Sequence, residues 1–153
     1  MKILRIRARR LSLALGLAVV LLASSGSSCS THVAPKVVID TADRAAYDAL
    51  RTFQTAEEAA WHANAGWPTP EQHKTINGKV SKAYTLIIDV ARIGIALPPG
   101  STLSIADLAV VAQLTTAVAD IVDLANGTSV QTQATAAQTK VGALVAGVSG
   151  VKP

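Results

Sequence analysis

Apolar residues recur at intervals of three, four and seven positions along much of this 153-residue chain, the period of helices with one buried face. The pattern is clearest at residues 69–127, where it predicts two long helices joined by residues 97–101. The first should begin after Thr69-Pro70 and end before Pro98, because proline suits a first helical position and disfavours helix in the preceding residue. Its buried stripe would be Ile76, Val80, Ala83, Ile87, Val90 and Leu97.

The second of these helices should begin after Ser104 and end at Asn126-Gly127, a pair typical of helix C-termini. Ser104 is a good N-cap, and Asp107 three residues later can complete a capping box. Gln72 stands in the same relation to Thr69 in the first helix. The apolar stripe of the second helix would be Val111, Leu114, Val118, Ile121, Val122 and Ala125.

Two more helices are predicted on either side of this pair. Asp40 or Thr41 should cap an alanine-rich helix that runs to about Ala65. Thr128, with Gln131 as its capping-box partner, can begin a weaker helix, although the composition of this last segment would also suit a disordered tail. A helical stripe favours the docked helix: Val130, Ala134, Ala137, Val141, Leu144 and Val148.

The predicted fold is therefore all-α, a small up-down bundle of three to four helices, because the connections between them are short. We assign residues 1–28 to a signal peptide, 29–40 to a tether and 41–150 to the bundle domain. Within the tether, residues 37–39 should be an apolar lead-in that packs against the bundle. The core should unite Leu50, Phe53, Ile87, Val111, Leu114, Val118 and Ile121.

The net charge of +4 is unevenly distributed along the chain. Five of the positive charges precede residue 11, whereas the chain from Cys29 onward carries nine lysines and arginines against ten acidic residues. The predicted domain thus has no basic patch interleaved with aromatic residues. We expect no nucleic-acid partner.

Residues 1–28 have the layout of a bacterial secretory signal peptide: a basic start, an apolar run at 11–23 and small residues at 24–28. A permanent membrane anchor is the alternative, but the apolar run is shorter than the roughly 20 residues that span a bilayer. Two later segments, 86–97 and 105–125, are also apolar. Acidic residues interrupt both, which favours a soluble bundle over a transmembrane hairpin.

Cys29 is the only cysteine, so no disulfide can form within the chain. Its position resembles that of the lipidated cysteine of exported bacterial lipoproteins, which follows a short lipobox. Ser27 and Ser28 match the small residues of that motif, while Gly26 stands where the family usually has a large aliphatic residue. The resemblance covers only about the first 30 residues and implies diacylglycerol on Cys29. The alternative is ordinary cleavage after Ser25, which would give a soluble periplasmic or secreted protein.

Candidates for a functional site gather around the turn between the first two helices. His62 and His73 flank this turn, and Glu57, Glu58 and Glu71 are nearby in sequence. The weak candidates for metal ligands are His62, His73 and Glu58. We expect no bound metal or cofactor, because two histidines leave a zinc site short of its usual three or four protein ligands.

The remaining candidates for chemistry are fewer still. Trp61 and Trp67 should pack at the corner, since tryptophans contribute large apolar surfaces to a core. The chain has no GxSxG, GxGxxG or CxxC motif, and no catalytic nucleophile can be nominated.

These observations favour a non-enzymatic protein of the cell envelope. It would be lipid-anchored to a membrane that faces the periplasm or the exterior, with a structural role or an unknown protein partner. The alternative is a small-ligand or metal-binding helical module centred on the Trp67-Pro68 corner. An exposed apolar stripe would favour the first interpretation and a concave pocket at the corner the second.

Overall fold

The computed structural model describes residues 36–64, 66–98 and 101–150, together with the backbone of Pro35. The expected signal peptide, Cys29 and the first part of the expected tether lie outside the described residues. The described chain forms four helices: α1 (Pro35–His62), α2 (Pro70–Ala96), α3 (Ile105–Ala125) and α4 (Gln131–Ser149). No strand occurs among the residues described, so the all-α prediction is confirmed.

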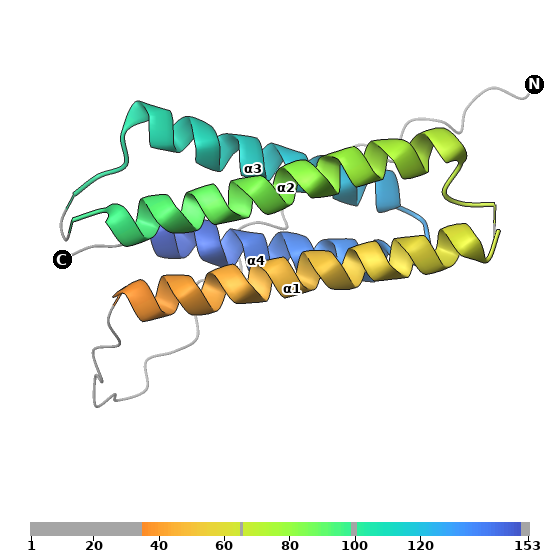
Figure 1. Ribbon diagram of the computed structural model, residues 1–153, viewed down its shortest axis with the longest axis horizontal. Coiled ribbons are helices and arrows are strands. Elements are labelled where there is room, and N and C mark those ends of the chain that lie inside the picture. Colours follow the sequence, from red (N-terminus) through yellow and green to blue (C-terminus); the bar gives the residue numbers. More distant parts are fainter. Residues whose placement is uncertain (1–34, 65, 99–100, 151–153) are drawn as a thin grey trace, which may run out of the picture. The chain divides into compact units, whose positions relative to one another are not determined.

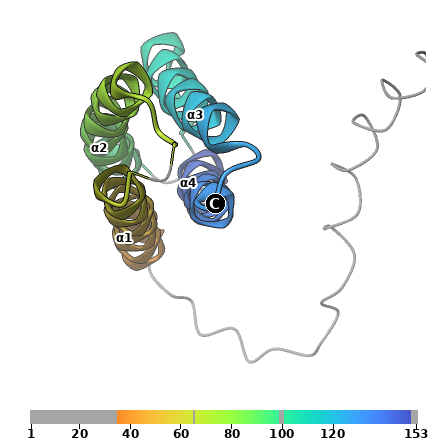
Figure 2. The same ribbon diagram turned by 90° about the vertical axis from the view of Figure 1, so that its right-hand side faces the viewer.

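The four helices run antiparallel in sequence order, as Figure 1 shows. α1 packs against α2 and α4, and α3 packs on the other side of the same two helices. Figure 2 shows this arrangement end-on, with α1 and α3 on opposite sides. We call the end with the α1–α2 and α3–α4 connections the corner end. The other end, where the chain enters α1, is the entry end.

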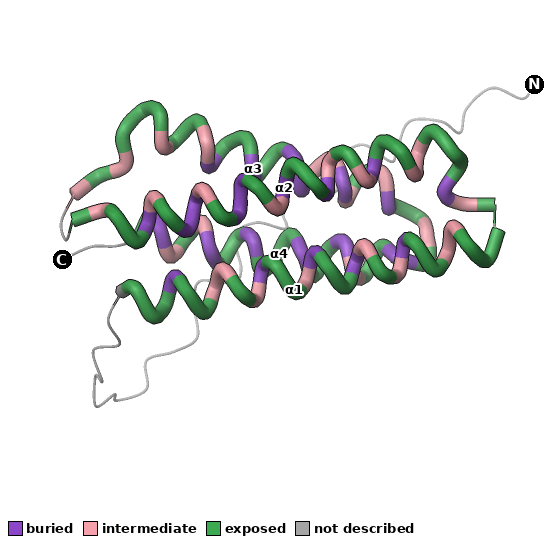
Figure 3. The backbone as a smooth tube through the Cα atoms, in the orientation of Figure 1, coloured by how far each residue is buried: buried purple, intermediate pink, exposed green. Residues whose placement is uncertain are grey.

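The core is one continuous cluster that all four helices supply (Figure 3). It follows the expected stripes except at Leu97, which follows the end of α2, and Val122, which are both half-buried. All seven residues predicted to unite in the core are buried. α4 lies against the rest of the bundle with its whole apolar stripe buried, so the last segment is a docked helix and not a tail.

Two capping boxes fix the starts of α2 and α3, and both match the prediction. The Thr69 side chain accepts a hydrogen bond from the Gln72 amide, and the Gln72 side chain accepts one from the Thr69 amide. Ser104 and Asp107 make the same reciprocal pair at α3. These bonds satisfy amide groups that have no partner within their helix.

The start of α1 differs from the expectation. The helix begins at Pro35, ahead of Asp40-Thr41, so the second half of the expected tether, including residues 37–39, is already helical. The Thr41 hydroxyl donates to the Val37 carbonyl within the helix and does not cap its start. The apolar register explains the extension, because Ile39 continues the stripe of Ala46 and is buried.

The start of α4 also differs from the expected capping box. α4 begins at Gln131, and its first turn has no side-chain cap. The Thr128 hydroxyl instead donates to the Ala125 carbonyl at the end of α3. The Gln131 side chain accepts a hydrogen bond from the Gly127 amide, whose residue has a positive φ of 75°. Both polar side chains therefore stabilise the tight α3–α4 turn.

Three helices approach most closely at Gly94, near the entry end. A Cβ atom added there would lie 2.6 Å from Cγ2 of Val148 in α4 and 2.9 Å from Cδ1 of Ile39 in α1. Real Cβ atoms essentially never come this close to their neighbours. The absence of a side chain at Gly94 thus allows α1, α2 and α4 to meet.

Among the described helices, α3 alone has the length and mean hydropathy, 1.7, of a possible membrane span. This property rests on length and composition only. In the bundle, one face of α3 is buried in the core through Val111, Leu114, Val118 and Ile121. Asp120, near the C-terminal end of α3, pairs with Lys79 of α2.

Candidate functional site

The polar residues singled out from the sequence lie around the corner end, which α1 and α2 form together. α1 ends at His62, and the chain turns through Asn64 and Gly66, both with positive φ. The Trp67–Pro68 peptide bond is cis, and the Pro68 side chain is buried under the turn. This connection brings the last two turns of α1 beside the first two turns of α2.

The central contact of the corner end joins Glu57 of α1 to His73 of α2. Nδ1 of His73 lies 2.9 Å from Oε1 of Glu57. The Glu57 side chain is completely buried, whereas 23% of the His73 side chain is exposed. Burying a carboxyl group without a polar partner is costly, so the contact with His73 offsets part of the cost of placing Glu57 between α1 and α2.

Two neighbours hold the His73 ring in place. The Trp61 ring stacks on it with centroids 4.6 Å apart and planes 5° from parallel. Nδ2 of Asn77, one turn further along α2, lies 3.1 Å from Nε2 of His73. When Asn77 donates to Nε2, Nδ1 carries the proton and donates to Glu57, which assigns the neutral Nδ1–H tautomer.

Polar atoms remain unsatisfied around this contact. Among the described residues, Oε2 of Glu57 and Oδ1 of Asn77 are buried and have no hydrogen-bond partner. Both are acceptors, so a proton donor or a cation is the chemistry that would complete them.

The three metal candidates named from the sequence do not come together. His73 points to Glu57, Glu58 is exposed and accepts from the Gln54 amide one turn earlier on α1, and His62 is exposed at the helix end. Glu71 is also exposed, in the first turn of α2. Nowhere in the described chain do three His, Cys, Asp or Glu side chains gather as metal ligands would.

Glu57 is the residue of the candidate site whose importance the sequence did not predict. It was grouped with Glu58 and Glu71 as merely near the corner, yet it alone is buried. A signal was present, because Glu57 continues the buried stripe of Ala46, Leu50 and Phe53 at spacings of three and four. A carboxylate at a core position indicates a buried partner on a neighbouring helix.

A second polar cluster lies on the outer side of α1 and α2. The rings of Tyr47 and Tyr84 lie 4.5 Å apart, and the Tyr84 hydroxyl donates to Gln54 at 3.2 Å. Partial burial, and then the neighbouring Tyr47, raise the pKa of the Tyr84 phenol above its ordinary value. Both effects disfavour the phenolate, so Tyr84 serves as a neutral hydrogen-bond donor at neutral pH.

Two shallow grooves of the described surface lie away from the Glu57–His73 contact. One shallow groove runs along the outer face of α1 beside Asp48, Arg51 and Thr55. A second, more apolar groove lies between α1 and α4 near the entry end and includes Val37, Val38 and Ala143. Neither groove is lined by Glu57 or His73.

Comparisons with known proteins assign this chain to no family. No protein-family model matches the chain, and no curated protein and no solved structure matches it either.

Proposed function

We propose that this chain is an exported, non-enzymatic protein of the bacterial cell envelope, lipid-anchored through Cys29, with a structural or protein-interaction role. The observation that carries the proposal is the arrangement of the first 29 residues: a basic start, an apolar run, small residues and then the only cysteine. A lone free thiol would be unusual in an exported protein, and lipidation removes it.

The corner end supports a structural role for the most conspicuous polar residues. The Glu57 side chain is fully buried, and its contact with His73 joins α1 to α2. Trp61 covers the histidine ring. Groups packed in this way contribute to the stability and specificity of the fold, and a substrate would have to displace the packing to reach them.

The exposed surface supports an interaction role. Large apolar side chains stand in solvent on three of the four helices, and Ile105 at the start of α3 is 88% exposed. A group of exposed apolar residues marks a binding surface for a protein or a membrane.

The proposal is tested by expressing the whole chain with its own N-terminus in a bacterium and recovering the mature protein. We expect the intact mass of a chain that begins at Cys29 and carries diacylglycerol, and partition of this protein into the detergent phase. Cys29→Ala is the matched control and should give neither result. A water-soluble wild-type product that begins at Gly26 would contradict lipidation and leave export standing.

A metal or ligand module at the corner is the competing function, and the unpaired Oε2 of Glu57 beside His73 is the observation in its favour. A ligand at a hundredfold excess over its dissociation constant would stabilise the fold by about 2.7 kcal/mol. We expect Zn²⁺ to leave the melting temperature unchanged. A rise that His73→Gln abolishes and His62→Gln preserves would establish the competing function.

A further inference from the structure

Exposed apolar side chains are concentrated at the entry end of the bundle. Of the seven large hydrophobic residues that are exposed in the described chain, five lie in the first turns of α1 and α3 and the last turn of α2. These five residues, which we call the entry surface, are Val37, Val38, Ile95, Ile105 and Leu108.

Packing of the bundle does not account for the entry surface. Ile105 is 88% exposed, and Val37 and Leu108 are 54% and 50% exposed. The first six residues of α3 include none that is buried, so this helix extends its apolar start beyond the core (Figure 3). An uncovered isoleucine leaves a large apolar side chain in contact with water, and burial against a second surface would be favourable.

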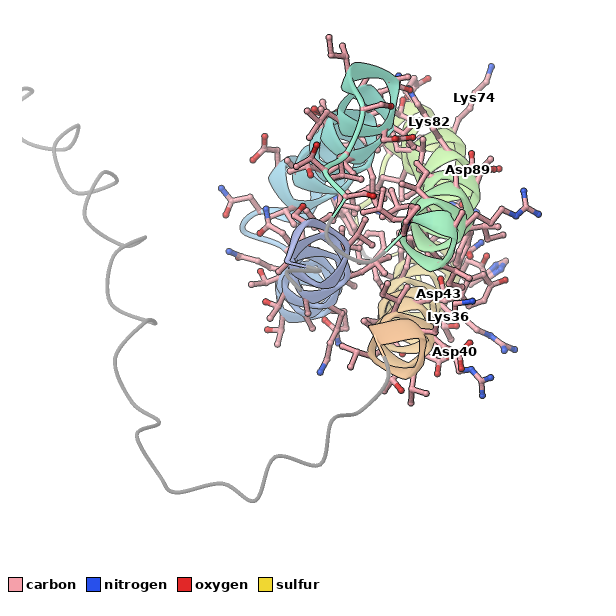
Figure 4. The ribbon with its side chains drawn as sticks, turned by 90° about the vertical axis from the view of Figure 1, so that its left-hand side faces the viewer. Lys36, Asp40, Asp43, Lys74, Lys82 and Asp89 are labelled. Carbon is pink, nitrogen blue, oxygen red and sulfur yellow. The ribbon has the colours of Figure 1, made fainter. Side chains whose placement is uncertain are left out.

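Charge is absent from the α2–α3 connection and from the end of α4, whereas the start of α1 carries Lys36 and Asp40. The sequence has no Lys, Arg, Asp or Glu from Ile93 to Ala106, and none from Val141 to Gly150. Asp107, the first charge in α3, is held in its capping box with Ser104. Figure 4 looks onto the entry end, where Lys36 and Asp40 at the start of α1 are among the labelled charges.

The apolar character continues from the entry surface into a groove between α1 and α4. Val37 and Val38 line this groove together with Ala42, Ala45 and Ala143. Lys140 is the charged residue of its wall. An apolar floor with a single cation at its rim suits contact with acyl chains below and phosphate groups beside them.

We infer that the entry surface docks on the lipid bilayer, so that the bundle sits on the membrane by its entry end. The inference rests on the proposed lipid anchor. Cys29 precedes Pro35 by six residues, which span at most about 20 Å when fully extended. The anchor would therefore hold this end, and not the corner end, against the headgroups. Interfacial segments bury their apolar side chains about 5–10 Å deep, a depth that the entry surface can reach without unfolding.

The test uses the lipidated mature protein in phosphatidylcholine vesicles, with and without brominated acyl chains that quench nearby tryptophan fluorescence. Ile105→Trp places a probe on the entry surface without touching the core. Thr116→Trp is the matched control, exposed on the same helix and about 16 Å further from the entry end. The native Trp61 and Trp67, at the corner end, supply a baseline.

The expected result is a blue-shifted Ile105→Trp signal that brominated lipid quenches several-fold more than the Thr116→Trp signal. A lipidated protein that floats with the vesicles but shows equal, weak quenching at both positions would overturn docking and leave the lipid anchor standing. A protein that lacks diacylglycerol and does not float would instead refute the anchor, and docking with it. An Ile105→Trp signal that shifts to the blue without lipid, in step with dimer formation by sedimentation, would assign the surface to a second copy and overturn docking.

A second measurement distinguishes insertion of the entry surface into the bilayer from a bundle that is only held close to the bilayer by its anchor. Val37→Trp reports on the same end from α1, where Val37 is exposed. Adding Ile105→Asp and Leu108→Asp should lower its quenching several-fold, because these charges resist burial at the interface. Quenching that the two aspartates leave unchanged would show a tethered bundle without a docked surface and would overturn the inference.

Discussion

The helices pack through a polar contact at the corner end of the bundle and through apolar contacts at the entry end. At the corner end, α1 and α2 are joined through a buried polar contact between Glu57 and His73. At the entry end, α1, α2 and α4 meet over Gly94, where the nearest side-chain atoms belong to Val148 and Ile39. At the corner end both tryptophans are half-buried, Trp67 against the core and Trp61 on the His73 ring, whereas the entry end leaves five large apolar side chains in solvent.

This difference shows how one helical pattern can serve two purposes. A buried polar contact specifies which helices pair and in which register, because few alternative packings would satisfy it. A close contact over a glycine allows tight packing of helices but does little to specify which helices pair. It also places no requirement on the side chains at the surface of the entry end. The corner end is therefore suited to fixing the fold, and the entry end to presenting a surface.

The largest effect is expected from breaking the polar contact at the corner end. His73→Leu should lower the free energy of unfolding by roughly 3 kcal/mol, because it leaves the buried Glu57 carboxyl group without its partner. Chemical denaturation followed by circular dichroism measures this loss. The double variant Glu57→Leu/His73→Leu should recover most of it, since apolar pairs often replace buried polar ones without loss. A double variant no more stable than the single one would contradict a pairwise contact.

A smaller loss of stability is expected at the entry end, where an apolar contact is disturbed in place of a polar one. Gly94→Ala should lower the free energy of unfolding by about 1–3 kcal/mol, because its Cβ would press on Val148 and Ile39. Gly142→Ala in α4 is the control, where an added Cβ meets nothing within 4 Å. That change should stabilise the protein by about 0.5–1 kcal/mol through helix propensity. Equal signs for the two alanines would show that α2 does not approach its neighbours at Gly94.

The two capping boxes should respond alike, although they lie at opposite ends. Thr69→Ala at the corner end and Ser104→Ala at the entry end should each lower the free energy of unfolding by about 1 kcal/mol. Each variant loses the hydrogen bond that its capping hydroxyl accepts from the backbone amide three residues later, whereas the reciprocal bond to its own backbone amide remains. Thermal melting of the two variants side by side measures this loss of stability. A Ser104→Ala effect near zero would show that the exposed start of α3 frays without cost.

The smallest effect concerns Asp43, on the entry half of α1. Partial burial, and then repulsion from Asp40, raise the pKa of its carboxyl group above the ordinary value of 3.8. The folded state thus binds this proton more tightly than the unfolded state. The contribution of Asp43 to stability is present below pH 3.8 and is lost as the pH rises through the raised pKa. Asp43→Asn should be more stable than wild type at pH 7 by less than about 0.5 kcal/mol, and the advantage should vanish near pH 3.

Most of the fold could be predicted from the sequence because its signals are local. The starts of α2 and α3 follow from Thr69 and Ser104 with their partners three residues later. The end of α3 follows from Asn126-Gly127. The stripe of α4 is buried at every predicted position from Val130 to Val148. Helical periodicity and capping motifs involve residues only a few positions apart, so they can be recognised from the sequence alone.

The prediction was wrong where a local signal competed with packing. Asp40 and Thr41 resemble a helix start, yet α1 already begins at Pro35, because burial of Ile39 beside Gly94 rewards another helical turn. Thr128 and Gln131 resemble a capping box, yet both bond into the α3–α4 turn. In each case a tertiary contact or a tight turn outweighed a cap worth about 1 kcal/mol.

The sequence by itself therefore determined the helices, their faces and the order in which they pack, since these depend on period, caps and short connections. Only the tertiary structure decided which corner residues meet. His73 could have faced His62 or Glu58 of α1, and the rotation of α1 against α2 brings Glu57 to it instead. The exposure of Ile105 was also undecided, because a helical pattern shows which residues are apolar but not how far the neighbouring helices extend to cover them.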